Sequence, residues 1–228
     1  MNNTRRLPNQ ALLQEASSLL IVTALCGAGG ALTTTANAAI IATPGVSPST
    51  PLNVPANIDG VYINVITGGT GISGAGTAGW DINPYSATAM QFFSPGAPAG
   101  GAILRFPGSA LVTAGNQTLG TLVDAAGAYN GSTAAVTFGA AAGNWALNAS
   151  NYFGFRFLNE DNGQVHYGWG RMDVGATATT RAVAELYFED QAGVGIPVGA
   201  TGIPEPTGSL LAAGAAGLLT LRRRRRTV

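Results

Sequence analysis

Glycine and asparagine break the middle of this chain into short runs of strand-forming residues. The 228-residue sequence contains 33 glycines, and apolar or aromatic runs recur between turn-forming residues after position 57. These runs lie at residues 61–66, 87–93, 102–106, 134–138, 152–158, 164–174 and 180–188. Frequent short strands separated by turns are typical of two antiparallel sheets packed face to face. The sequence therefore predicts a mainly β protein with an antiparallel, jelly-roll-like β-sandwich.

The clearest pairing signal is a hairpin formed by residues 152–158 and 164–173. Residues 159–163, Asn-Glu-Asp-Asn-Gly, form a five-residue loop of turn formers between the two runs. Large side chains recur at every second position: Phe153, Phe155 and Phe157 in the first run and Val165, Tyr167 and Trp169 in the second. Because side chains alternate between the two faces of a strand, each set shares one face. We expect the paired strands to place these residues as one aromatic layer against an opposite sheet.

The amino-terminal segment has the features of a secretory signal. Arg5 and Arg6 precede an apolar run at residues 19–25, and the small-x-small sequence Ala-Asn-Ala ends at Ala38. We expect signal peptidase to cut after this site, so that the mature chain begins at Ala39. A buried amphipathic helix is the alternative, but the glycines that follow the apolar run weaken it.

Residues 203–228 contain three parts in a defined order. Pro204, Glu205 and Pro206 come first, an apolar stretch at residues 208–221 follows, and the basic tail is Arg222, Arg223, Arg224, Arg225 and Arg226. The prolines hold the tripeptide extended and remove backbone donors. As a helix the apolar stretch would span about 21 Å, less than the roughly 30 Å hydrocarbon core of a bilayer. We therefore expect transient membrane insertion with the arginines in the cytoplasm; an uncut tail anchor is the alternative.

With this order of motif, apolar helix and basic tail, the chain resembles the PEP-CTERM family of exported bacterial proteins. The resemblance implies that a membrane-embedded exosortase recognises Pro204, Glu205 and Pro206, and that the protein is sorted to the cell surface or extracellular matrix. Members of the family are often associated with extracellular polysaccharide, which is therefore an expected partner. The aromatic hairpin at residues 152–173 is also similar to the last third of many members. That broader similarity carries no known activity.

These signals divide the chain into four parts. They are a signal peptide at residues 1–38, a Pro-rich flexible segment at 39–56, a β-sandwich domain at 57–202 and a sorting signal at 203–228. The second part contains Pro44, Pro48, Pro51 and Pro55 among Ser, Thr and Gly. This composition favours a loose, polyproline-II-like segment rather than a strand or a helix.

The composition of the predicted mature body excludes several classes of partner and cofactor. Residues 39–202 contain four arginines, no lysine and nine acidic residues, a formal charge of −5. Nucleic acid is not an expected partner, because phosphate binding needs clustered Lys or Arg. The body has one histidine and no cysteine, too few ligands for a zinc site. We expect no metal and no cofactor, and a stability that depends on a core instead of disulfides, since the only cysteine is Cys26.

No catalytic residue is expected from the motifs. His166 lies in the middle of a predicted strand, and the sequence has no Gly-x-Ser-x-Gly motif, the nucleophile elbow that presents a catalytic serine. We interpret it as structural, with a general base as the alternative. Residues 69–74, Gly-Thr-Gly-Ile-Ser-Gly, match a dinucleotide-binding pattern, but more glycines and a proline follow where that motif requires a helix. This run is interpreted as a flexible loop.

Acidic side chains leave two alternatives open. Residues 159–163 offer oxygen ligands for calcium, but their spacing departs from an EF-hand loop, and a solvated turn is the simpler interpretation. A glycosidase would need two carboxyl groups at a defined separation in space, which sequence spacing does not establish. The acids considered for such a pair are Asp59, Asp81, Glu160 and Asp161. A matrix-modifying polysaccharide hydrolase is therefore the alternative function.

The candidate ligand contacts lie in one loop-like stretch and are Trp80, Asp81, Asn83 and Tyr85. Aromatic rings there can stack on a sugar while the polar groups bond its hydroxyls. The alternative is that Trp80 caps the core, because most tryptophans are largely buried. The function that we expect is a non-catalytic one: a secreted protein of the envelope or polysaccharide matrix, structural or carbohydrate-contacting.

Overall fold

The computed structural model describes residues 38–96, 100–109 and 113–202. The predicted signal peptide up to residue 37, the motif at 204–206 and the arginines at 222–226 lie outside the described residues. Within the described ranges the protein is mainly β and contains no helix. The strands are β1 (Ile40–Ala42), β2 (Leu52–Asn53), β3 (Tyr62–Ile63), β4 (Thr70–Gly71), β5 (Asn83–Tyr85), β6 (Gln91–Phe93), β7 (Ala102–Leu104), β8 (Leu122–Val123), β9 (Tyr129–Asn130), β10 (Thr133–Ala135), β11 (Ala149–Asn159), β12 (Gln164–Val174), β13 (Arg181–Glu189) and β14 (Ile196–Pro197).

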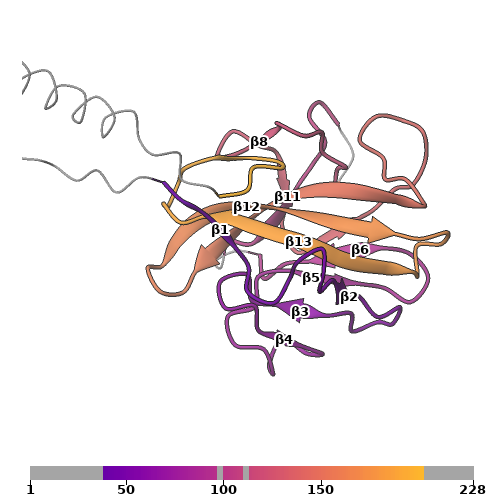
Figure 1. Cartoon of the computed structure of the whole chain (residues 1–228), viewed down its shortest axis with the longest axis horizontal. Coiled ribbons are helices and arrows are strands. Elements are labelled where there is room, and N and C mark those ends of the chain that lie inside the picture. Colours follow the sequence, from indigo (N-terminus) through magenta and orange to yellow (C-terminus); the bar gives the residue numbers. More distant parts are fainter. Residues whose placement is uncertain (1–37, 97–99, 110–112, 203–228) are drawn as a thin grey trace, which may run out of the picture. The chain divides into compact units, whose positions relative to one another are not determined.

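The largest sheet is antiparallel and has the strand order β1-β13-β12-β11-β7-β9, with β2 also paired to β13. Its centre is the long hairpin of β11 and β12, next to β13 (Figure 1). This confirms the hairpin predicted from the sequence. Its loop is one residue shorter than expected, because Asn159 pairs with Gln164. Gly163 has a φ of 67°, a left-handed conformation that glycine adopts without a steric cost.

The register of the hairpin separates aromatic residues that we expected to form one layer. Phe153 lies opposite Gly170, whereas Trp169 lies opposite Gly154. Directly opposed residues of an antiparallel pair share a face, so Phe153 and Phe155 lie opposite glycines on one face, and Trp169 points to the other side. The expectation of a single aromatic layer is therefore wrong. The sheet carries large side chains on both of its faces.

The phenylalanine face packs against the three-stranded sheet β10-β6-β5. The ring of Phe92 in β6 lies 4.8 Å from that of Phe153 and 5.8 Å from that of Trp145, measured between centroids. Buried side chains from both sheets and from the connecting segments complete this core, among them Ile63, Ile82, Met90, Met172, Val183 and Leu186. Burial of apolar surface is the main favourable contribution to folding, so this larger core holds the two sheets together.

A second, smaller core covers the opposite face of the large sheet. It consists of Leu104, Val123, Tyr167, Trp169, Ile196 and Val198. The short pair β8–β14 contributes to it, and Figure 1 places β8 on the other side of the long strands from β5 and β6. Strands that are buried on both faces need apolar residues at consecutive positions. This explains why the central strands carry aromatic residues on both faces, such as Phe153 on one and Trp169 on the other.

Residues 39–56 join the sheet, although their prolines predicted a loose segment. β1 pairs with Tyr187 to Glu189 of β13, and β2 pairs with Ala182 and Val183 of the same strand. Val46 and Val54 belong to the larger core. The expectation that residues 39–56 form no strand is therefore wrong for these stretches. Pro44, Pro48, Pro51 and Pro55 all lie outside β1 and β2, so their missing N–H groups remove no hydrogen bond from the sheet.

Both cores are built between Ile40 and Ala200. This stretch therefore has a hydrophobic core of its own, which is the requirement for folding independently. Among the residues that the structure describes, none of the sheets closes on itself. In the part of the chain that the structure describes, no helix is long and apolar enough to cross a membrane.

Candidate functional site

Trp80 lies at the margin of the larger core, between two other aromatic rings. It meets Tyr62 edge-on at 4.8 Å and stacks on Phe93 at 5.4 Å, measured between centroids. Aromatic pairs of this kind contribute about 0.5–1.5 kcal/mol beyond their buried area. The indole is nevertheless only half-buried, and it lines a surface cavity. Trp80 therefore supports the fold with part of its ring while another part remains accessible.

Asp81, the next residue, is a buried carboxyl group. It is 2% exposed, and its Oδ2 accepts a hydrogen bond from the Val65 amide at 2.8 Å. Burial raises the pKa of Asp81 to about 8; the Val65 hydrogen bond opposes this rise, and the charge of Glu160 adds to it. At neutral pH the carboxyl therefore holds its proton in most molecules. A protonated carboxyl donates one hydrogen bond and still accepts others.

Glu160 lines the same cavity as Trp80 and Asp81, and this cavity has a volume of about 340 Å³. Glu160 also lines a neighbouring cavity of about 330 Å³, which shares Ala78 and Gly79 with the first. Gly79 has a φ of 61°, and a Cβ there would lie 2.6 Å from the Oε1 of Glu160. The side chain of Glu160 thus lies over a glycine backbone, which no other residue type would permit without a shift. The first cavity is completed by Gly74, Thr77, Pro95 and Leu158.

The structure does not gather all four of the ligand contacts predicted from the sequence. Asn83 is 2% exposed, and its Nδ2 donates to the Asp59 carbonyl at 3.0 Å. Asn83 and Tyr85 both lie in β5, and neither lines the cavity of Trp80 and Asp81. Only Trp80 and Asp81 of the four share this cavity. From the sequence, Glu160 could be considered only as one of several scattered acids. It lies about 80 residues after Trp80 and Asp81 in the chain, and no sequence pattern indicates that the hairpin loop contacts the stretch before β5.

The cavity combines an indole, a protonated carboxyl and a second carboxyl group. An aromatic face can pack on the C–H side of a sugar ring, while the exposed carboxyl of Glu160 accepts from a hydroxyl. The volume of the cavity lies at the lower end of the range of about 300–1,000 Å³ that is typical of ligand sites. The arrangement therefore suits a small polar ring better than an extended apolar ligand.

His166 has a structural position. Its side chain is fully buried; Nδ1 lies 2.8 Å from the Glu189 carbonyl oxygen, and Nε2 lies 3.0 Å from the Nδ2 of Asn162. A carbonyl only accepts and an amide NH₂ only donates, so Nδ1 carries the hydrogen and Nε2 accepts. Both ring nitrogens are occupied, and neither partner is a nucleophile or an orienting acid.

The hairpin loop uses its side-chain oxygens within the turn. The Oδ1 of Asn159 accepts from the Asp161 amide at 2.8 Å, and the Oδ1 of Asn162 accepts from the Gln164 amide at 2.9 Å. Such contacts between a side chain and the backbone two residues later are typical of turns. Over residues 38–96, 100–109 and 113–202, no group of three or more His, Cys, Asp and Glu is placed to hold a metal ion.

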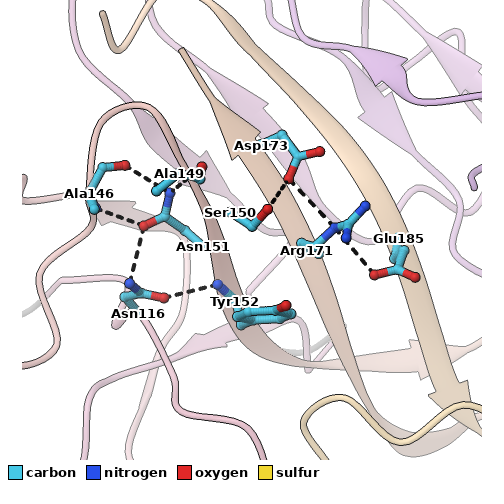
Figure 2. A network of polar contacts seen from close by, with 9 residues as sticks. All are labelled: Asn116, Ala146, Ala149, Ser150, Asn151, Tyr152, Arg171, Asp173 and Glu185. Carbon is cyan, nitrogen blue, oxygen red and sulfur yellow. Dashed lines mark hydrogen bonds and ion pairs between the residues drawn. The ribbon is translucent and has the colours of Figure 1, made fainter. Parts of the chain in front are cut away.

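A separate polar network connects β11 to the loops beside it, as Figure 2 shows. Asn116 accepts a hydrogen bond from the Tyr152 amide at 2.9 Å and donates one to the Oδ1 of Asn151 at 3.1 Å. Asn151 is fully buried, and its side chain also bonds both the amide and the carbonyl of Ala146, at 2.7 and 3.0 Å. Buried amides satisfied in this way favour one arrangement of the chain.

The same view shows a row of polar and charged side chains that spans three adjacent strands. The Nε of Arg171 in β12 lies 3.3 Å from Glu185 in β13 and 3.5 Å from Asp173 in β12. Ser150 of β11 donates to Asp173 at 2.6 Å. These contacts join neighbouring strands on the face opposite the phenylalanines, and we assign them a structural role.

Comparison of the chain with protein-family models, with curated proteins and with solved structures found no match. No relative therefore assigns a role to these residues. What the site can do follows from its own geometry.

Proposed function

We propose that this protein is exported, sorted by an exosortase and active outside the cell as a non-catalytic component, either structural or carbohydrate-contacting. The order of motif, apolar stretch and arginines in residues 203–228 supports the sorting half of the proposal. The observation that carries the carbohydrate half is the cavity shared by Trp80, Asp81 and Glu160. The formal charge of −5 on the predicted mature body favours neutral or cationic partners over phosphate polymers.

We also propose that the fold is a β-sandwich, as the sequence led us to expect. The supporting observation is that the Phe92 ring of the three-stranded sheet contacts the Phe153 ring of the seven-stranded sheet within one core. In this arrangement the Trp80 cavity lies beside strands of the smaller layer, because Trp80 stacks on Phe93 of β6. A rigid scaffold of this kind positions loop residues for contact with a ligand.

The sorting proposal is tested by the intact mass of protein from the surface of the producing bacterium. We expect a chain that begins at Ala39 and ends near Pro206, and we expect the tail to be retained when the exosortase gene is deleted. Surface-located protein that still carries arginines 222–226 in the presence of the exosortase would contradict the proposal.

The carbohydrate proposal is tested by binding of the domain to the extracellular polysaccharide of the same bacterium. Trp80→Ala should weaken binding several-fold, since one aromatic contact contributes about 1 kcal/mol. Glu160→Gln, in an exposed loop, should also weaken it without disturbing the core. Tyr85→Ala is the matched control, because Tyr85 is half-buried nearby but does not line the cavity. Equal affinity of all four proteins would remove this cavity as the contact.

A polysaccharide hydrolase is the second candidate, and one observation favours it. Asp81 and Glu160 line one cavity, and burial raises the pKa of Asp81 to about 8. A protonated carboxyl beside a second carboxyl is the arrangement from which glycosidases take their acid and base or nucleophile. Release of reducing sugar by the purified domain, abolished by both Asp81→Asn and Glu160→Gln, would establish hydrolysis. Absence of release alongside measurable binding would favour the non-catalytic role.

A further inference from the structure

Ala39, the residue expected to begin the mature chain, contacts the end of β13 through its backbone. Its nitrogen donates to the Oδ1 of Asp190 at 2.7 Å, and its carbonyl accepts from the Asp190 amide at 3.0 Å. The next residue, Ile40, opens β1 opposite Glu189. The first residue after the predicted cleavage site is therefore already a paired residue at the edge of the sheet.

Two carboxyl groups lie beside this nitrogen. Asp190 is exposed, whereas Glu189 is only 3% exposed. Burial raises the pKa of Glu189, and hydrogen bonds from the Gln191 and Ala39 amides oppose that rise, while the neighbouring Asp190 adds to it. In the described residues no basic side chain is paired with either carboxyl; the two ion pairs of this part of the chain are both made by Arg171. The pair of acids thus has a backbone nitrogen as its partner.

Cleavage at the predicted site would change the charge of that partner. Hydrolysis of the bond between Ala38 and Ala39 consumes one water; the carbonyl carbon of Ala38 takes the hydroxyl, and the nitrogen of Ala39 takes the hydrogen. At neutral pH the new acid gives its proton to the new amine, so a carboxylate leaves with Ala38 and an ammonium remains on Ala39. The Ala39 nitrogen thus changes from a neutral amide with one N–H donor to a cationic ammonium with three N–H donors. Ala38 is exposed, so its departure opens no hole in the fold.

We propose that Asp190 and Glu189 form a binding site for the α-ammonium group that signal peptidase creates on Ala39, so that removal of the signal peptide strengthens a contact already present at the edge of the sheet. The proposal rests on the export and cleavage site given under the proposed function. It goes beyond them by assigning the receptor for the new terminus. Its physical basis is that an opposite charge at hydrogen-bond distance stabilises both partners.

The site also lies next to the point where the sorting segment begins. A Cβ on Gly202 would lie 1.9 Å from the Ile40 carbonyl oxygen, so Gly202 packs directly on β1. The carbonyl of Ala200 accepts from the Nε1 of Trp169 at 2.9 Å, which holds this segment on the smaller core. Fixing Ala39 therefore fixes the strand on which the last residues before Ile203 rest.

The direct test is the pKa of the α-amino group in a chain of residues 39–206, prepared from a fusion that leaves Ala39 as the first residue. NMR of the Ala39 methyl group between about pH 6 and pH 11 follows this titration. We expect a pKa about one unit above the usual 7.7–8.0, because the carboxylates favour the charged form. Asp190 and Glu189 are the charged groups that face the nitrogen. Asp190→Asn should remove at least half of this increase in the α-amino pKa. Asp59→Asn, which removes an exposed carboxylate elsewhere on the domain, is the control and should leave the pKa unchanged.

A second measurement compares residues 39–206 with residues 36–206, which retain Ala-Asn-Ala and carry the charge three residues away. At pH 7 the chain that begins at Ala39 should have a Tm higher by about 1–3 °C, as expected for a partly exposed ion pair. The difference should vanish in Asp190→Asn. An α-amino pKa of 7.7–8.0 that Asp190→Asn does not change would overturn the binding site. Amino-terminal sequencing of the exported protein tests the premise separately, because a first residue other than Ala39 would show that signal peptidase cuts elsewhere.

Discussion

Gly170 of β12 lies directly opposite Phe153 of β11, and a Cβ at position 170 would come within 2.4 Å of the Cζ of Phe153. The same relationship joins Gly168 to Phe155, again at 2.4 Å. Glycine ordinarily weakens a strand. Here the phenylalanine rings occupy the space that the missing side chains leave, so the glycines are part of the core.

The first prediction concerns this packing. Gly170→Ala should destabilise the domain by about 1–3 kcal/mol, because the added methyl group forces the Phe153 ring or the Leu186 side chain to move. Urea denaturation measures the change. Gly131→Ala is the control, since a Cβ there meets nothing closer than 3.8 Å, and it should change stability by less than about 0.5 kcal/mol. Equal effects at the two positions would contradict the proposed packing.

The second prediction concerns Arg181, which is 3% exposed and donates to the backbone instead of to a carboxylate. Its guanidinium bonds four carbonyls from three separate segments, those of Pro55, Ser86, Ala89 and Ala178. Burial lowers its pKa. A lysine side chain has one nitrogen, so it cannot replace both the Nη1 contacts to Ala89 and Ala178 and the Nη2 contacts to Pro55 and Ser86. Arg181→Lys should therefore cost at least about 2 kcal/mol, because buried carbonyls lose their donors.

The control for this prediction is Arg171→Lys. Arg171 is partly exposed and lies 3.3 Å from Glu185, and surface ion pairs contribute at most about 1 kcal/mol. Chemical denaturation of both variants gives the comparison. A loss at position 181 no larger than that at position 171 would mean that the four carbonyls find other donors.

The third prediction is a pH dependence that originates at Asp81. Its pKa of about 8 in the folded protein lies above the value of about 3.9 in an unfolded chain. Between these values the folded state holds a proton that the unfolded state has released, so this group's contribution to stability falls as the pH rises from about 4 to about 8. The slope is at most about 1.4 kcal/mol per pH unit.

Asp81→Asn should remove this slope, because the amide does not titrate and its oxygen still accepts from the Val65 amide. Unfolding free energies of the two proteins, measured from pH 4 to pH 9, should therefore converge at low pH and diverge in favour of the variant at high pH. Asp161→Asn, an exposed position, should follow the wild type. Parallel curves for wild type and Asp81→Asn would show that Asp81 is ionised in the folded protein.

The fourth prediction concerns the mature domain as a whole. A chain of residues 39–206 should give a mainly β circular dichroism spectrum, and its Tm should be unchanged by dithiothreitol, since the only cysteine, Cys26, precedes it. A helix-dominated spectrum would refute the fold. The same chain without reducing agent serves as the reference.

The sequence by itself determined the mainly β character, the central hairpin and the turn that ends at Gly163. These features depend on short-range signals, namely alternation along a strand and residues that tolerate turn geometry. The same signals overestimated the length of some strands, because a strand extends only as far as a neighbouring strand pairs with it. Residues 61–66 contain only the strand Tyr62–Ile63, and residues 87–93 contain only the strand Gln91–Phe93.

Only the tertiary structure decided how distant segments meet. The hairpin register placed Phe153 and Trp169 on opposite faces, since a shift of one residue exchanges the faces of a strand. The Pro-rich segment pairs with the edge of β13 through β1 and β2. The hairpin loop brought Glu160 to Trp80 and Asp81. Each of these contacts joins residues far apart in the chain, and its free energy depends on the shape and burial of the partner surface, which no local pattern encodes.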